Sequence, residues 1–291
     1  MNVSRAALPA MALTALALAS LAPACGDDGG GGAQTADVGY LDVPDNVDGP
    51  PSDFGAADMV TAAKYGRIQV EIDQMTGKGP ASQALTDLEA ALDAMIADGH
   101  LDKPGGVDFV TDETLPTSGG VVHTFAELDT VGRAYRNLAV PAGSASIHVL
   151  YVDGSYEDDS GSSRVLGFAY GGSFMVMFKD SITSGCASSS VLALFPLIRD
   201  RICARVEATV FLHELGHLFG LVNNGTPMVD DHQDDAHGAH DVDPDCLMYW
   251  QIDGTKAVDI VGQRFSGGGE PDLGFCPASL ADLDAAIART R

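Results

Sequence analysis

The stretch from His213 to His217 reads His-Glu-Leu-Gly-His and constrains this chain more than any other feature. It lies inside Val206–Leu221, an apolar run without proline, which predicts a buried helix. Residues four apart share one face of a helix, so both imidazoles can point at one metal ion, with Glu214 one position further round. A surface helix with two unrelated histidines is the alternative, but the apolar flanks argue against it because unpaired imidazoles are costly when buried. The stretch therefore predicts a zinc site.

Composition limits the partners of the chain. Its 291 residues can form one large domain or two small ones, and a hydrophobic fraction of 45% indicates a globular core. The formal net charge of −25 would repel nucleic acids and anionic lipid headgroups. DNA and RNA are therefore excluded as partners.

The first 24 residues have the pattern of an export signal. Arg5 supplies a positive charge, and Met11–Leu21 is apolar but too short to span a bilayer. Residues 22–24 then precede Cys25, an order that resembles a bacterial lipoprotein signal, in which this cysteine carries the lipid. Cleavage of an ordinary secretory signal after Ala24 is the alternative. We expect a monomer at the cell envelope that meets the membrane only through the lipid on Cys25.

Four cysteines remain once Cys25 is set aside. An even number of cysteines in an exported protein predicts two disulfides, for which three connectivities exist. Proximity along the chain favours Cys186–Cys203 and Cys246–Cys276. Four buried free thiols are the alternative, which fits an oxidising compartment less well.

The chain divides into four parts. Residues 1–24 form the signal, and residues 25–63 are rich in Gly and Asp, which predicts a flexible tether. The end of that tether can also be a short pro-segment or a first helix. Residues 64–222 carry ordered strand and helix patterns, and residues 223–291 form a smaller subdomain, irregular at first, that closes with a helix.

Strands that alternate with helices predict an α/β fold. Alternating apolar residues indicate strands at Arg67–Asp73, Gly105–Val110, Ser144–Val152, Arg164–Tyr170 and Ser173–Lys179. Apolar stripes indicate a first helix that begins near Pro80. They indicate further helices at Thr124–Leu138, Val206–Leu221 and Pro277–Thr290. This order indicates a mostly parallel sheet with helices on its faces.

A glycine at position 220 follows the motif, three residues after His217. It would let the chain leave the helix in a left-handed turn. This arrangement resembles the metzincin clan of zinc proteases, in which the turn delivers a third metal ligand three residues later. That position is Asn223 here, and an amide oxygen is a poor zinc ligand. The third ligand must therefore come from elsewhere.

A second match lies downstream. His240 is followed by Asp241, four residues, Cys246, one residue and Met248. The archaemetzincin family is similar, with His-Cys, four residues, Cys, one residue and Met around its third ligand. An insertion within Leu221–Ala239 would reconcile the spacing. The resemblance implies a twisted, mostly parallel sheet with an active-site helix, His240 as third zinc ligand, and Met248 in the turn beneath the metal.

The inserted loop contains other polar residues. His237 is the runner-up for the third ligand. His237 and His232 both lie among aspartates, however, and histidines in such surroundings are typical of a solvated loop. Asp231, Asp234 and Asp235 can orient a ligating imidazole or bind calcium.

Tyr249 follows Met248 directly. Its hydroxyl can help to stabilise an oxyanion if it points toward the zinc. In relatives with such a tyrosine, it lies two residues after the methionine, where this chain has Trp250. Met248 itself can also be simple core packing, a role that is compatible with a place beneath the metal.

These residues predict a zinc-dependent endopeptidase. Three imidazoles leave zinc an open position for water, and the metal lowers the pKa of that water. Glu214 would take the proton as the water attacks a peptide carbonyl, and would pass it to the leaving nitrogen. Peptides or proteins would be the substrates, and Arg164–Lys179 can supply a strand edge along which an extended substrate pairs.

Two alternatives remain open. A non-catalytic, surface-tethered binding lipoprotein with a degenerate structural zinc site would explain Asn223, but such a site has no need of Glu214. A gluzincin-like enzyme would need a downstream glutamate ligand. Glu270 is the one glutamate after the motif, and it lies in a glycine-rich stretch that does not predict a helix.

Overall fold

The computed structural model describes residues 54–160, 163–266 and 272–291. The signal peptide, Cys25, residues 25–53 of the tether and Glu270 lie outside the described residues, so their roles stay predictions. Within the described ranges, no helix has both the length and the apolar character needed to cross a bilayer.

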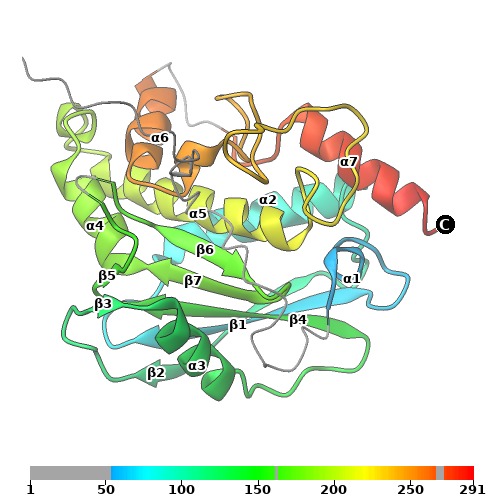
Figure 1. Ribbon diagram of the computed structural model, residues 1–291, viewed down its shortest axis with the longest axis horizontal. Coiled ribbons are helices and arrows are strands. Elements are labelled where there is room, and N and C mark those ends of the chain that lie inside the picture. The colour runs from blue at the N-terminus through cyan, green and yellow to red at the C-terminus, as the bar shows by residue number, and fades with distance from the viewer. Residues whose placement is uncertain (1–53, 161–162, 267–271) are drawn as a thin grey trace, which may run out of the picture. The chain divides into compact units, whose positions relative to one another are not determined.

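Strands and helices alternate through the first two thirds of the described chain (Figure 1). The strands are β1 (Arg67–Met75), β2 (Val107–Leu115), β3 (Val122–His123), β4 (Ser144–Val152), β5 (Ser155–Tyr156), β6 (Gly167–Tyr170) and β7 (Phe174–Phe178). The helices are α1 (Ala56–Val60), α2 (Ser82–Asp98), α3 (Phe125–Tyr135), α4 (Lys179–Ser188), α5 (Arg199–Leu218), α6 (Lys256–Ser266) and α7 (Pro277–Ala288), with short 3-10 turns at Leu192–Leu194 and Trp250–Ile252.

The central sheet has five strands in the order β2-β1-β4-β7-β6. All neighbours pair in parallel except β6, which runs antiparallel to β7 at one edge. The predicted mostly parallel α/β sheet is therefore confirmed. Its five predicted strands are all present, while α4, α6 and the small β3–β5 pair were not predicted.

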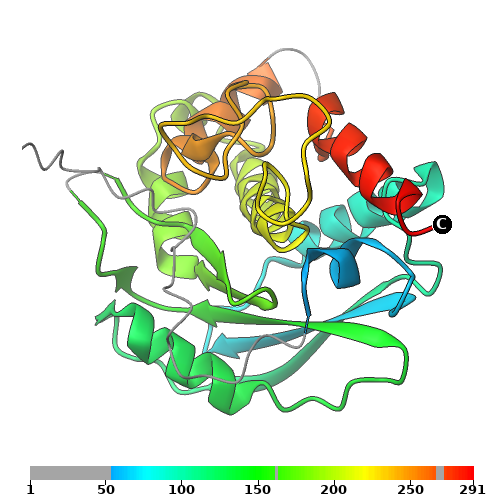
Figure 2. The same cartoon turned by 45° about the vertical axis from the view of Figure 1, so that its right-hand side comes forward.

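Helices cover both faces of this sheet. In Figures 1 and 2, α2 and α5 lie on one face and α3 on the other. Side chains that alternate along the strands form a hydrophobic cluster on each face of the sheet. Ile147 and Val149 of β4 pack into the core under α5. Leu150 and Val152 pack with Leu128 of α3. Strand β4 is consequently buried along its whole length.

Two disulfides join segments around α5 and α7. Cys186 of α4 is bonded to Cys203 of α5, and Cys246 is bonded to Cys276, the residue before α7. The pairing that proximity favoured is confirmed. The second bond ties the start of the last helix to the loop that precedes the 3-10 turn at Trp250–Ile252.

Helix α1 lies near the end of residues 25–63, where the sequence allows a tether, a short pro-segment or a first helix. The buried ammonium of Lys103 donates to the main-chain oxygens of Asp58, Thr61 and Tyr65, each at 2.6 Å. Ala56 lies against Gly220, where an added Cβ would come within 2.6 Å of the Ala56 Cβ. The first described residues are therefore packed beside the end of α5.

Candidate metal centre

Helix α5 carries the two motif histidines at the end of a long buried stretch. Both imidazoles are buried, and their Nε2 atoms lie 3.1 Å apart. The Nδ1 of His213 lies 2.7 Å from the carbonyl oxygen of Leu247, so Nδ1–H donates there and Nε2 keeps its lone pair for a metal. The predicted sharing of one helix face by His213 and His217 is present in the structure.

His240 brings a third imidazole to the same place from the loop after α5. Its ring centroid lies 5.3 Å from that of His213 and 5.0 Å from that of His217. Its Nδ1 lies 2.6 Å from the carbonyl oxygen of His237, which again leaves Nε2 as the metal-facing atom. The structure thus brings the resemblance-derived ligand to the motif helix.

Asp253 completes the cluster and was not predicted. One of its carboxylate oxygens contacts His213 Nε2, and the other lies 2.9 Å from His240 Nε2. Its carbonyl oxygen accepts a hydrogen bond from Leu166 N at 2.8 Å, which fixes the backbone beside the segment leading into β6. No spacing rule links position 253 to the motif, so the sequence held no signal for it.

The donor set fits a zinc ion. Ligand atoms of His213, His217, His240 and Asp253 all lie within 4.8 Å of one another, and all four residues are buried. Imidazole nitrogens and a carboxylate oxygen are ordinary zinc donors. Buried groups of this kind are therefore positioned to hold a metal ion.

The charges in the cluster depend on one another. Burial lowers the pKa of His217 well below its ordinary value, and the neighbouring imidazoles of His213 and His240 lower it further. Burial alone would raise the pKa of Asp253, but His213 and His240 outweigh it and hold that pKa below its usual range. His217 is therefore neutral and Asp253 ionised, which are the forms that bind a metal.

Glu214 lies beside the cluster as a buried carboxyl group. Neither of its side-chain oxygens makes a hydrogen bond of normal geometry among the described residues, although the backbone N–H of Ala169 lies close enough to lower its pKa. Burial raises the pKa of Glu214 well above its ordinary value, and the nearby Asp253 raises it further. A carboxyl group that no other side chain holds by a hydrogen bond is available for proton transfer.

Met248, for which the resemblance implies a place beneath the metal, packs against Gly216 of the motif helix. It is fully buried, and a Cβ added to Gly216 would lie 2.3 Å from its sulfur. The main chain around it also supports the ligands, because Leu247 O accepts from His213 and Met248 O accepts from Asp241 N at 2.8 Å. The turn therefore packs and orients the site together.

The end of α5 adopts the turn that the glycine predicted. Gly220 has φ +74°, and Leu221 N donates to Gly216 O as the helix closes. Asn223 is also left-handed but exposed, and its amide donates to Gln233 Oε1 at 3.4 Å. Asn223 is thus not among the residues that the structure gathers at the metal cluster.

The two other histidines of the inserted loop have different surroundings. His237, the runner-up ligand, lies outside the cluster; its ring stacks on Trp250 at 4.1 Å and its Nδ1 lies 2.6 Å from Asp234 Oδ2. His232 is not a solvated loop residue, because it is 8% exposed and lies between the carboxylates of Asp241 and Asp282. Two buried acceptors explain why this histidine is folded inward.

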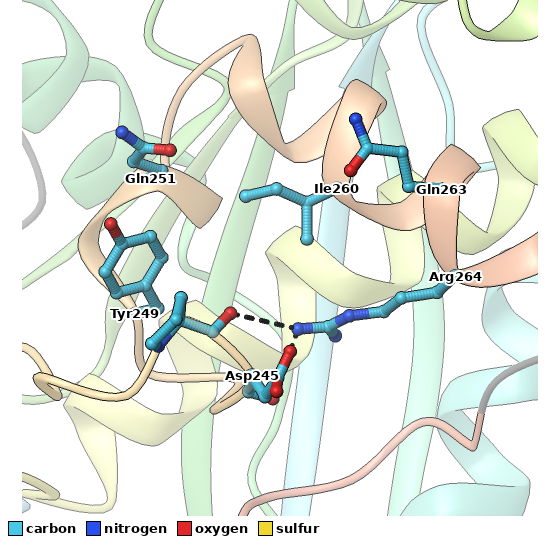
Figure 3. Close-up of a pocket in the computed structure, with 7 residues that line it drawn as sticks. Asp245, Tyr249, Gln251, Ile260, Gln263 and Arg264 are labelled. Atoms are coloured by element: carbon cyan, nitrogen blue, oxygen red, sulfur yellow. Dashed lines mark hydrogen bonds between the residues drawn. The ribbon is translucent and has the colours of Figure 1, made fainter.

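Tyr249 lines a separate pocket of about 390 Å³ (Figure 3). The lining residues are Pro244, Asp245, Tyr249, Gln251, Ile260, Gln263 and Arg264. The guanidinium of Arg264 donates to the carbonyl oxygens of Pro244 and Asp245, which holds the loop against α6. None of the four clustered metal-binding candidates lines this pocket, so the predicted oxyanion role of Tyr249 gains no support from its position.

A smaller pocket of about 60 Å³ does reach the cluster. It is lined by Ala56, Ala169, Tyr170, Gly172, His217, Leu218 and Asn224. It therefore lies between a metal-binding candidate and the edge strand β6.

Comparison with known proteins gives one distant likeness. No family model and no curated protein matches the chain. Among solved structures, a zinc-dependent peptidase from Methanocorpusculum labreanum (strain Z) is similar with a TM-score of 0.44 and 16% identity, covering 74% of this chain and 99% of that chain. The roles of the site residues therefore rest on the geometry described above.

Proposed function

We propose that this chain is an exported zinc-dependent endopeptidase of the metzincin type, with Glu214 as its general base. The observation that carries the proposal is the buried carboxyl group of Glu214, which no side chain holds by a hydrogen bond, beside three imidazoles that face one point. A structural metal site has no use for such a group, whereas hydrolysis requires one.

His213, His217 and His240 would hold the metal. A zinc ion held by them would supply polarisation of the substrate carbonyl and a lowered pKa for the attacking water. Glu214 accepts the proton of that water and delivers it to the leaving nitrogen. Burial raises the pKa of Glu214, and a divalent metal ion beside it would favour the ionised form that accepts the proton.

The edge strand supports a peptide as substrate. Strand β6 pairs with β7 on one side and is the last strand of the sheet on the other. An extended peptide can add to such an edge through main-chain hydrogen bonds. Ala169 of β6 and His217 line the same small pocket, so a peptide along this edge would pass beside the cluster.

Asp253 favours a second candidate function, a structural zinc site in a binding protein. Three imidazoles and one carboxylate form a complete tetrahedral set, and structural zinc sites are closed in this way. Glu214 opposes this candidate for the reason given above.

Peptide hydrolysis tests the proposal. The purified chain is incubated with a mixed-sequence peptide library, with chelator and with zinc added back, beside the variants Glu214→Gln and Glu89→Gln. Glu89 is an exposed residue of α2 and serves as the matched control. We expect cleavage that chelator abolishes and zinc restores, a loss of at least about 10²-fold in Glu214→Gln, and no change in Glu89→Gln. Full activity of Glu214→Gln would contradict the mechanism, and a folded, zinc-loaded chain without activity would favour the structural site.

Export is a separate part of the proposal. The N-terminal pattern supports it, and the two disulfides fit an oxidising compartment. Cys25→Ser should move the chain from the membrane fraction to the soluble exported fraction. Retention of the variant in the membrane fraction would contradict a lipid anchor at Cys25.

A further inference from the structure

Asp253 occupies a position that the three-histidine site does not explain. Its two carboxylate oxygens face two different imidazoles, at the Nε2 atoms of His213 and His240. The Nδ1 atoms of both rings are already used by the carbonyl oxygens of Leu247 and His237. Asp253 therefore meets the same nitrogen atoms that a metal would meet.

Asp253 has no lysine or arginine partner among the described residues, so only the imidazoles of His213 and His240 lie beside its charge. Glu214 is a second buried carboxyl group in the same space. A buried carboxylate is costly unless a cation accompanies it, and a divalent metal ion would balance Asp253 and favour ionisation of Glu214.

The backbone holds Asp253 in place. It follows the 3-10 turn at Trp250–Ile252, its carbonyl oxygen accepts from Leu166 N, and Gly254 forms an isolated bridge with Val165. These bonds tie the residue to the segment that enters β6. Asp253 is thus held by the segment that enters the edge strand.

We propose that Asp253 is a fourth protein ligand of the metal in the resting protein, and that an incoming ligand with metal-binding oxygens displaces it. The displacement rests on the proposed endopeptidase function, whereas the ligation does not. With Asp253 bound, the metal has three imidazoles and one carboxylate, and no position for water. A substrate carbonyl aligned on β6 would compete for the place of the carboxylate, and the attacking water would then bind as a fifth ligand.

Metal affinity gives the first test. The chain and its variants Asp253→Asn, Asp253→Ala and Asp245→Asn are loaded with zinc and titrated with a competing chelator. Asp245 is an exposed acidic residue of the preceding loop and is the control. We expect both Asp253 variants to lose on the order of 10–100-fold in zinc affinity and Asp245→Asn to lose none. Equal affinity in all four proteins would overturn the proposal.

Cobalt spectroscopy separates a bound carboxylate from a supporting one. In the cobalt-loaded chain we expect no broadening of the paramagnetic resonance by ¹⁷O-water, because no water is bound. In Asp253→Ala the broadening should appear, the visible bands should shift, and acetohydroxamate should bind at least about tenfold more tightly, a difference of about 1.4 kcal/mol. Broadening in the unmodified chain would overturn the proposal, and this measurement needs no variant to fold.

The outcomes distinguish this inference from the proposed function. If the spectroscopic changes appear but no peptide is cleaved, Asp253 is a metal ligand and the proposed endopeptidase function is contradicted. A chain that cleaves peptides and shows bound water in the unmodified state contradicts the fourth ligand alone.

Discussion

His232 Nδ1 lies 2.6 Å from Asp241 Oδ2, although both belong to a loop without regular structure. The other ring nitrogen lies 2.9 Å from Asp282 of α7, so one buried imidazole joins the loop to the last helix. Asp241 directly follows His240, and its backbone N–H donates to Met248. Through its contact with Asp241, His232 thus supports both His240, the third candidate ligand, and the turn that contains Met248.

The first prediction concerns His232→Gln and its dependence on pH. Burial alone would lower the pKa of His232, but the hydrogen bonds to Asp282 and Asp241 outweigh it and raise the pKa above the ordinary 6.5. The stabilisation from a raised pKa is fully present below pH 6.5 and is lost as pH rises through the folded-state value. We expect His232→Gln to lower the free energy of unfolding by about 3 kcal/mol near pH 6, and by less as pH rises.

Chemical denaturation between pH 6 and 9 measures this difference. His100→Gln removes a more exposed histidine that pairs with Asp284, and should cost less than about 1 kcal/mol. A difference between the unmodified chain and His232→Gln that does not change with pH would show that the imidazole is not charged between its two carboxylates.

Local spacing made part of the site predictable. The pairing of His213 with His217 follows from helical periodicity, and the turn at Gly220 follows from the conformational freedom of glycine. His240 is predicted from the resemblance to archaemetzincins, because an insertion upstream of it leaves its spacing to Met248 unchanged. Each of these predictions uses residues that are close in sequence or joined by a known spacing.

Contacts between distant segments could not be predicted in this way. Asp253 reaches the cluster because it follows the 3-10 turn at Trp250–Ile252 and because Leu166 N donates to its carbonyl oxygen. His232 is buried because Asp282, 50 residues later, supplies a second carboxylate. Neither contact has a period or a motif, so tertiary packing alone decides them.

The second prediction concerns Gly216→Ala within the motif. The new Cβ would lie 2.3 Å from Met248 Sδ and 2.9 Å from Phe275 Cε1, closer than packed atoms can approach. We expect a loss of about 1–3 kcal/mol in the free energy of unfolding and weaker zinc binding, because Met248 must move from beneath the ligands. Gly274→Ala is the control, since a Cβ there meets nothing within 4 Å.

A double-mutant cycle with Met248→Ala shows whether the clash is the cause. The smaller residue makes room for the new Cβ, so Gly216→Ala should cost less in the Met248→Ala background. Additive losses in the cycle would show that the clash with Met248 is not the cause.

The third prediction concerns the anchor of helix α1. Burial lowers the pKa of Lys103 to about 8, so the side chain is still mostly charged at pH 7. Lys103→Met would leave three main-chain oxygens without their donor, and we expect a loss of about 3 kcal/mol. Hydrogen exchange should increase most in residues 54–66, while Lys256→Met, a change at an exposed residue of α6, should leave it unchanged. Uniform exchange along the chain would contradict a local anchor.

The last prediction compares the two disulfides. Cys246–Cys276 closes 30 residues and Cys186–Cys203 closes 17, so replacing either pair by serine should cost about 3–4 kcal/mol in the free energy of unfolding. Their effects on the metal should differ. Cys246 lies two residues before Met248, in the turn whose main chain bonds to His213 and Asp241, whereas Cys203 lies ten residues before the motif on the same helix.

Zinc competition and chemical denaturation on the two double variants measure both quantities together. We expect Cys246→Ser/Cys276→Ser to lose zinc affinity on the order of tenfold, and Cys186→Ser/Cys203→Ser to keep it, because only the first pair supports the ligand-orienting carbonyls. If the two variants lost zinc affinity equally, the change would reflect general loss of stability. The turn at Met248 would then orient the site without help from the bond to α7.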